Sequence, residues 1–308
     1  MNSYKNRNSE GFVSSLIGER TPAKTAGLVY TVSALAIFAL SFVLSFALMF
    51  SPAEEGTPQW LLYAQFLAVP VSFLFVLPLY FSYTKTPVKA FVKEQKCPAK
   101  YYLIAVLLQV GLFGLSEVNS LFLELLKGFG YTDTGIELPS MEGFGFVGVF
   151  FTVAIFPALM EELVFRGIFL RETKEFSLLA RVVLCGALFA LYHQNPAQTV
   201  YQFICGAAFA LVAIKSGSFL PTALAHFVNN GAILILTKCG VESFSPTAYA
   251  IVLTTAGVCL VGTLVYLLVF DRKAEEKKGG SYRQLFSCAS VGIAMFFLSW
   301  IAMLFTGM

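Results

Sequence analysis

The sequence predicts an all-α membrane protein whose helices cross the bilayer several times. Hydrophobic residues make up 57% of the 308 residues and charged residues only 13%, whereas soluble domains carry about 25% charged residues. Apolar stretches near 20 residues recur along the chain, and a helix of that length crosses a bilayer. A membrane β-barrel would instead show segments of about ten residues with alternating polarity. The small net charge of +3 gives no reason to expect nucleic acid as a partner.

Nine segments are predicted as membrane helices, with an eight-span arrangement as the alternative. They cover residues 28–50, 60–83, 101–125, 144–170, 179–193, 200–214, 219–237, 249–270 and 285–305. In the third segment, Glu117, Asn119 and Ser120 interrupt the apolar run. Residues 120–129 could therefore form a separate amphipathic helix at the membrane surface.

The distribution of Lys and Arg predicts the orientation, because connections rich in these residues stay on the cytoplasmic side. Residues 1–27 contain four of them, residues 84–100 five and residues 271–284 five, whereas residues 51–59 contain none. This alternation predicts a cytoplasmic N-terminal tail, residues 1–27, and an external C-terminus. Without an internal repeat, we expect residues 28–308 to form one bundle. The protein is expected to be multi-pass, in the plasma membrane if its source is prokaryotic.

Two adjacent carboxylates and an arginine interrupt the apolar run of the fourth segment. Charged side chains at that depth are costly and usually functional. On a helix, Glu162 and Arg166 lie four residues apart and can form an ion pair. Glu161 projects about 100° away and has no partner in the local sequence. Pro157 removes a backbone hydrogen bond one turn earlier, which predicts a kink beside Glu161.

Both histidines of the chain, His193 and His226, lie in apolar segments. Phe189 shares a helix face with His193, since the two are four residues apart. Asn230 shares a face with His226 for the same reason. At 1.5 Å per residue, Glu161, His226 and His193 lie roughly 15, 12 and 18 Å from the expected cytoplasmic ends of their helices. The three side chains could therefore meet in one site.

Such a set of side chains supports hydrolysis. Glu161 in a partly apolar pocket can act as general base toward a water molecule, and an imidazole can relay the proton. A second histidine with an asparagine amide can donate hydrogen bonds to a developing oxyanion. Glu161, His193 and His226 could instead bind Zn²⁺, because His nitrogen and Glu oxygen are ordinary zinc ligands. The HExxH spacing, the best-defined one of zinc proteases, is absent, so no cofactor is certain and Zn²⁺ stays the alternative.

Two other functions stay open at this point. A proton-coupled secondary transporter would use Glu161, Glu117 and the histidines as a proton relay. The lack of an evident inverted repeat counts against transport. A non-catalytic immunity or scaffold protein would retain the same side chains without turnover, and a Glu–Arg pair can also simply hold membrane helices together.

Three short motifs resemble those of the CAAX-protease and bacteriocin-processing (CPBP) family of intramembrane proteases, which includes CAAX prenyl endopeptidases and Abi-like proteins. EELVFR at residues 161–166 resembles the family's EExxxR motif, FALYH at 189–193 its FxxxH motif, and HFVNN at 226–230 its HxxxN motif. The motifs occur in the family's order, within a core at about residues 144–237.

The resemblance implies an endopeptidase with a polar cavity inside the helical bundle. It implies that Glu161 is the base that activates water and that His193 assists it. It also implies that His226 and Asn230 form the oxyanion-stabilising pair. The family is described both as metalloproteases and as metal-free glutamate proteases, and we expect the metal-free form.

The resemblance gives supporting roles to three further residues, Glu162, Arg166 and Phe189, which would hold the catalytic carboxylate in place. The expected partners are the lipid bilayer and a peptide or protein substrate. That substrate would be a prenylated C-terminal tail or a bacteriocin-type peptide.

Overall fold

The computed structural model describes residues 19–50, 58–133, 135, 137–241, 243–271 and 279–307, and all regular structure in them is helical. The elements are α2 (Pro22–Leu48), α3 (Gln59–Thr84), α4 (Val88–Glu94), α5 (Lys100–Phe113), α6 (Ser116–Gly128), α7 (Gly145–Val149), η1 (Phe150–Ile155), α8 (Phe156–Glu162), η2 (Leu163–Phe169), α9 (Leu170–Glu172), α10 (Leu178–Tyr192), η3 (Pro196–Gln198), α11 (Thr199–Ser216), α12 (Leu220–Lys238), α13 (Pro246–Val265), η4 (Tyr266–Phe270) and α14 (Tyr282–Thr306). The predicted all-α fold is confirmed.

Eight helical stretches of the described chain are long and apolar enough to cross a membrane, which confirms the polytopic architecture. The remaining predicted segment, residues 179–193, is α10. Its 15 residues span about 22 Å, less than the roughly 30 Å of a hydrocarbon core. His193 is the C-cap of α10, and Gln194 adopts a left-handed conformation with φ of 56° that turns the chain. The fifth segment is therefore a short helix that ends at His193.

The predicted third helix is divided into α5 and α6, and α6 begins at Ser116 rather than at Ser120. The side chain of Asn119 holds α6 against the start of α11. Its amide nitrogen donates to the carbonyl oxygen of Ala197 at 2.7 Å, and its oxygen accepts from the backbone N–H of Tyr201 at 3.1 Å. The polar residue that interrupts the apolar run thus makes a tertiary contact.

Much of the predicted tail (residues 1–18) and most of the basic loop (residues 272–278) lie outside the described residues. The cytoplasmic position of the N-terminus therefore stays a prediction.

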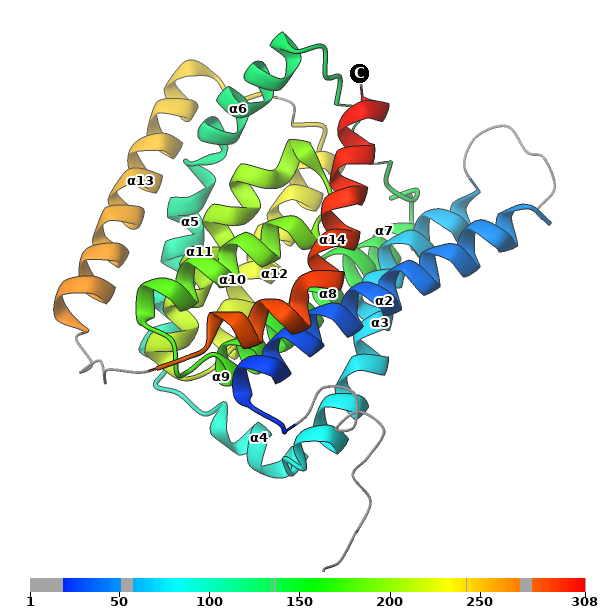
Figure 1. Cartoon of the computed structure of the whole chain (residues 1–308). Coiled ribbons are helices and arrows are strands. Elements are labelled where there is room, and N and C mark those ends of the chain that lie inside the picture. The colour runs from blue at the N-terminus through cyan, green and yellow to red at the C-terminus, as the bar shows by residue number, and fades with distance from the viewer. Residues whose placement is uncertain are drawn as a thin grey trace, which may run out of the picture.

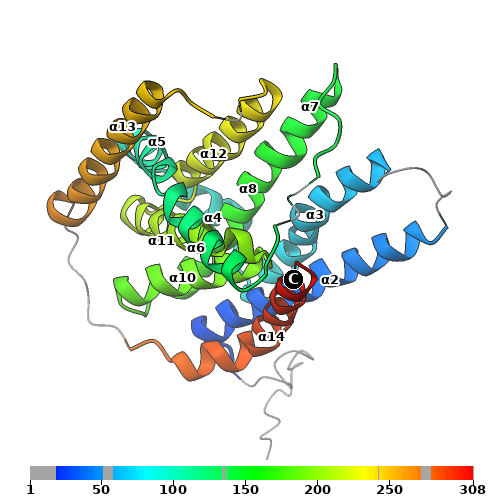
Figure 2. The same ribbon diagram turned by 90° about the horizontal axis from the view of Figure 1, so that it is seen from above.

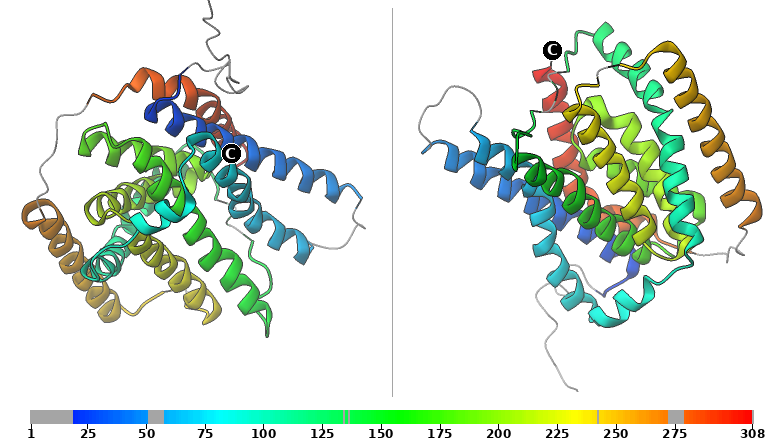
Figure 3. Two further views of the ribbon diagram at one scale, coloured as in Figure 1. Left: turned by 90° about the horizontal axis from the view of Figure 1, so that it is seen from below. Right: turned by 180° about the vertical axis from the view of Figure 1, so that it is seen from behind.

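The helices form a bundle with α10, α11 and α12 near its centre and α13 at one edge (Figures 1 and 2). α14 packs along α2, α10 packs along α11, and α5 packs against both α12 and α13. α2 and α3 pack on each other and extend together beyond the rest of the bundle (Figure 3). α8 packs against α3 and α12, so this arrangement surrounds the two adjacent carboxylates with other helices.

Two glycines let α10 and α11 approach closely. A Cβ atom added at Gly186 would lie 2.8 Å from the carbonyl oxygen of Phe203, and one at Gly206 would lie 2.9 Å from Cα of Gly186. Small residues at such interfaces allow membrane helices to gain close packing. The Cβ of Phe189 would lie only 3.2 Å from a Cβ at Gly206. The glycine contact therefore sets the position of the helix end that carries His193.

Gly186→Ala is expected to destabilise the protein by about 1–3 kcal/mol, because its new methyl group would meet backbone atoms that cannot move aside. The measurement is thermal unfolding in detergent. Gly257→Ala on α13 is the matched control, since a Cβ there meets nothing within 4 Å. The control should keep or slightly raise the melting temperature because Ala favours helix. Equal melting temperatures for the two variants would contradict this account of the interface.

Candidate active site

The fourth span is irregular where its two carboxylates lie. α8, which carries Glu161 and Glu162, is preceded by the π-helical η1 and followed by the π-helical η2. Such π-helical turns are frequent at functional sites. Pro157 has no N–H to donate to the carbonyl oxygen of Val153, as a regular α-helix would require. That oxygen accepts a hydrogen bond from Nδ2 of Asn230 at 2.9 Å. The proline thus leaves an acceptor for a side chain of α12.

The predicted ion pair between Glu162 and Arg166 is confirmed. Nη1 of Arg166 lies 2.9 Å from Oε1 of Glu162, and both side chains are 0% exposed. The same Oε1 lies 3.1 Å from Nδ1 of His226, and Nη2 of Arg166 donates to the carbonyl oxygen of Gly206 at 3.2 Å. Because a carboxylate accepts, Nδ1 of His226 carries the hydrogen. Glu162 therefore orients His226 and leaves its Nε2 facing elsewhere.

Three phenylalanine rings surround the Arg166 guanidinium. Its Cζ lies 4.1 Å from the ring centroid of Phe189, 5.6 Å from that of Phe209 and 5.8 Å from that of Phe165. Aromatic faces attract cations, most strongly away from water. Phe189 also packs edge-on against the ring of His193 at 4.6 Å between centroids. Phe189 therefore contacts both the ion pair and the histidine of its own motif.

Glu161 and His193 face each other across a short gap. Oε2 of Glu161 lies 4.0 Å from Nε2 of His193, and the side chains are 8% and 16% exposed. Nδ1 of His193 lies 2.8 Å from the carbonyl oxygen of Phe189. That oxygen can only accept, so Nδ1 carries the hydrogen and Nε2 of the neutral ring is an acceptor. Two acceptors that bind one water at about 2.8 Å each lie about 4 to 4.5 Å apart. The gap therefore suits a shared water molecule.

His226 and Asn230 lie one turn apart on α12, which packs against α8. Asn230 donates one N–H to Val153 and accepts a hydrogen bond from Nδ2 of Asn229 at 3.0 Å. A primary amide has two N–H groups, so Asn230 retains a second donor. Nε2 of His226 donates when the ring is protonated and accepts when it is neutral. The structure thus brings His226 to Glu162, and His193 to Glu161.

Several neighbours of this site were not predicted from the sequence. The hydroxyl group of Tyr192 is buried and makes no hydrogen bond with the described residues. The side chains of Gln109 and Asn229 are hydrogen-bonded to each other at 2.8 Å. The signals in the sequence were weak: Gln109 is the sole amide among residues 101–116, and Asn229 directly precedes a motif residue.

The three residues that were considered as alternative zinc ligands do not gather around a common point. Among the residues that the structure describes, no three His, Cys, Asp or Glu side chains group closely enough to hold a metal ion. Glu161, His193 and His226 are therefore not grouped around one point. Zinc sites in enzymes have three protein ligands around the ion. The arrangement therefore does not fit a metal, and no step below uses one.

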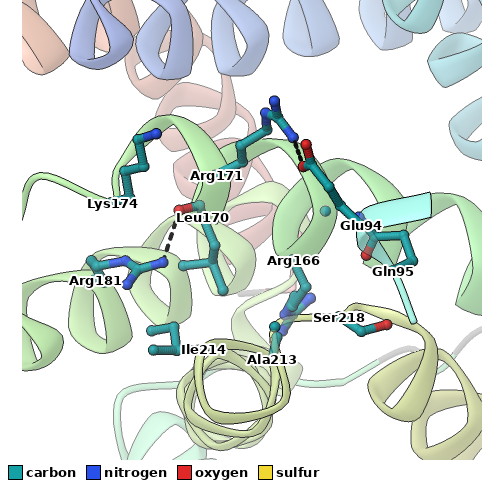
Figure 4. A pocket seen from close by; sticks show the side chains of 12 residues that line it. Glu94, Gln95, Arg166, Leu170, Arg171, Lys174, Arg181, Ala213, Ile214 and Ser218 are labelled. Carbon is teal, nitrogen blue, oxygen red and sulfur yellow. Dashed lines mark hydrogen bonds and ion pairs between the residues drawn. The ribbon is translucent and has the colours of Figure 1, made fainter. Parts of the chain in front are cut away.

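A cavity of about 180 Å³ lies between α4, α9 and the start of α10, beyond Arg166 (Figure 4). Its lining includes Arg171, Lys174 and Arg181, and Arg171 forms an ion pair with Glu94 there. Arg166 is also in the lining, whereas Glu161, Glu162, His193 and His226 are not. The cavity therefore meets the candidate active site only at Arg166.

A comparison with models of protein families supports the resemblance of this region to a known family. Residues 143–232 match the model of a family described as type II CAAX prenyl endopeptidase, Rce1-like. Searches of curated proteins and of solved structures found no match. The matched segment begins just before α7, ends within α12 and contains all three motifs. The resemblance predicted from those motifs is therefore confirmed: over residues 143–232, this chain carries the sequence pattern of the Rce1-like CAAX prenyl endopeptidase family.

Proposed function

We propose that the chain is an intramembrane endopeptidase in which Glu161 and His193 activate a water molecule. The observation that carries this proposal is the 4.0 Å separation of two acceptors, Oε2 of the buried Glu161 and Nε2 of the partly buried His193. A general base must reach the proton that it removes, either directly or through one water. The family match supports the reaction class, because the family is described as endopeptidases.

In the proposed reaction, the water donates one hydrogen to Glu161 and the other to His193. Its oxygen attacks the carbonyl carbon of the peptide bond while Glu161 takes the proton. The resulting oxyanion accepts hydrogen bonds from the second N–H of Asn230 and from Nε2–H of protonated His226. Glu161 then passes its proton to the nitrogen of the leaving amine as the C–N bond breaks. The products are a carboxylic acid and an amine.

We propose a membrane-associated peptide or protein tail as the substrate. The family description names prenylated CAAX tails, which makes these the first class to test; a bacteriocin-type peptide is the second. The structure offers the transporter hypothesis no comparable support. Glu117, the additional carboxylate of that proposed relay, is exposed on α6.

Glu161→Gln is expected to lower kcat by about 10²–10⁴-fold, because glutamine keeps the size of the side chain but cannot take a proton. The measurement uses purified protein in detergent and a fluorogenic prenylated CAAX peptide. Glu117→Gln makes the same chemical change at an exposed carboxylate and should leave cleavage intact. Full cleavage by Glu161→Gln would overturn the proposed mechanism.

Arg166→Met is expected to destabilise the protein by about 3–5 kcal/mol, because it leaves the buried carboxylate of Glu162 without its cation. Replacing both partners, as Glu162→Leu with Arg166→Met, should recover most of that stability. The double variant should nevertheless stay inactive, because His226 loses the acceptor that orients it.

Thermal unfolding and peptide cleavage, measured on the same preparations, check both parts of this expectation. If the double variant regained cleavage together with stability, the orienting role of Glu162 would be wrong.

A further inference from the structure

We propose that Gln109 is a positioning residue that fixes the orientation of the Asn230 amide through Asn229. Gln109 lies on α5, outside the segment that matches the family. The inference rests on the proposed function, because it concerns the donor that Asn230 offers to the oxyanion. Its support is a chain of hydrogen bonds in which the donors and acceptors match for only one orientation of each amide.

The chain starts at a fixed backbone acceptor. The carbonyl oxygen of Val153 can only accept, so the nitrogen of the Asn230 amide must face it, at 2.9 Å. The oxygen of Asn230 consequently points to Asn229 and accepts from its Nδ2 at 3.0 Å. Because Pro157 supplies no competing N–H, the helix distortion itself sets the direction of the first amide.

The second amide is held from the opposite side. With its nitrogen directed to Asn230, Asn229 must present its oxygen to α5 and α11. That oxygen accepts from Nε2 of Gln109 at 2.8 Å and from the hydroxyl group of Tyr201 at 3.2 Å. Nε2 of Gln109 also donates to the oxygen of Tyr201 at 3.4 Å, which directs the tyrosine hydrogen toward Asn229. Two donors therefore converge on one oxygen.

A reversed Asn229 amide would break this pattern at both ends. Its nitrogen would face the donors of Gln109 and Tyr201, and its oxygen would face the oxygen of Asn230. Asn230 could then satisfy that contact only by turning its own nitrogen away from Val153, which would redirect its second N–H. Preorganised donors contribute to catalysis only when they point at the developing charge. Gln109 and Tyr201 thus keep the second N–H of Asn230 in its orientation.

The burial of Gln109 favours a positioning role over a purely structural one. The residue is 0% exposed, and its Oε1 has no hydrogen-bond partner in the described part of the chain. An unpaired buried polar atom lowers stability, so leucine at this position should be tolerated. The oxygen of Asn229 would still accept from Tyr201, and no new unpaired atom would arise there.

The first test is Gln109→Leu in the full-length protein. We expect kcat to fall by about tenfold, as the loss of one orienting hydrogen bond allows, with KM and the melting temperature unchanged. Gln284→Leu is the matched control, since Gln284 lies on α14 and bonds to Thr21; it should retain full turnover. Tyr201→Phe, which removes the other donor to Asn229, should lower kcat in the same way. Unchanged kcat in Gln109→Leu would overturn the proposal.

A double-mutant cycle with Asn230→Ala tests whether Gln109 acts through that residue. In the Asn230→Ala background, Gln109→Leu should cause no further loss of kcat. An equal loss in both backgrounds would show that Gln109 acts independently and would overturn the inference. Glu161→Gln, assayed alongside, distinguishes a failure of the proposed function from a failure of the role of Gln109. If Glu161→Gln still cleaves the peptide, the proposed function is refuted. If Glu161→Gln abolishes cleavage but the losses of kcat in Gln109→Leu and Asn230→Ala are additive, only the role of Gln109 is refuted.

Discussion

The buried ion pair between Glu162 and Arg166 is the interaction on which the rest of the site depends. Two charges at 0% exposure inside an apolar bundle persist only when each is compensated. Here the compensation comes from several helices: the Arg166 guanidinium reaches the backbone of α11, and the Glu162 carboxylate reaches His226 on α12. Oε1 of Glu162 holds both partners, and this is why we propose the adjacent Glu161 as the carboxylate that reacts.

A second constraint comes from the backbone of the same span. π-helical segments lie on both sides of α8. Because Pro157 has no N–H, the carbonyl oxygen of Val153 can accept a hydrogen bond from Nδ2 of Asn230. One irregular span therefore carries the proposed base Glu161, the carboxylate of Glu162 that contacts His226, and the carbonyl oxygen that holds Asn230. The other helices supply the partners, so the site is a product of helix packing rather than of one motif.

Features that depend on local spacing could be predicted from the sequence. The apolar segments gave the helices, and the interval of four residues gave the pair of Glu162 with Arg166. Features that depend on tertiary packing could not. The sequence contains no sign that His226 contacts Glu162, because the two lie on different helices. The start of α6 was also misplaced: Asn119 lies inside this helix and contacts Ala197 of η3 and Tyr201 of α11. No spacing in the sequence related Gln109 to a motif residue, so its contact with Asn229 could not be predicted.

The short length of α10 determines which helices must contact the chain that follows His193. Because α10 ends early, the irregular chain that follows His193 must have its polar groups satisfied by protein rather than by lipid. Asn119 on α6 binds the carbonyl of Ala197, and Trp300 on α14 donates to the hydroxyl of Thr199 at 2.8 Å. Both helices lie outside residues 143–232. Helices without motifs thus provide hydrogen-bond partners for the turn beside the histidine of the matched segment.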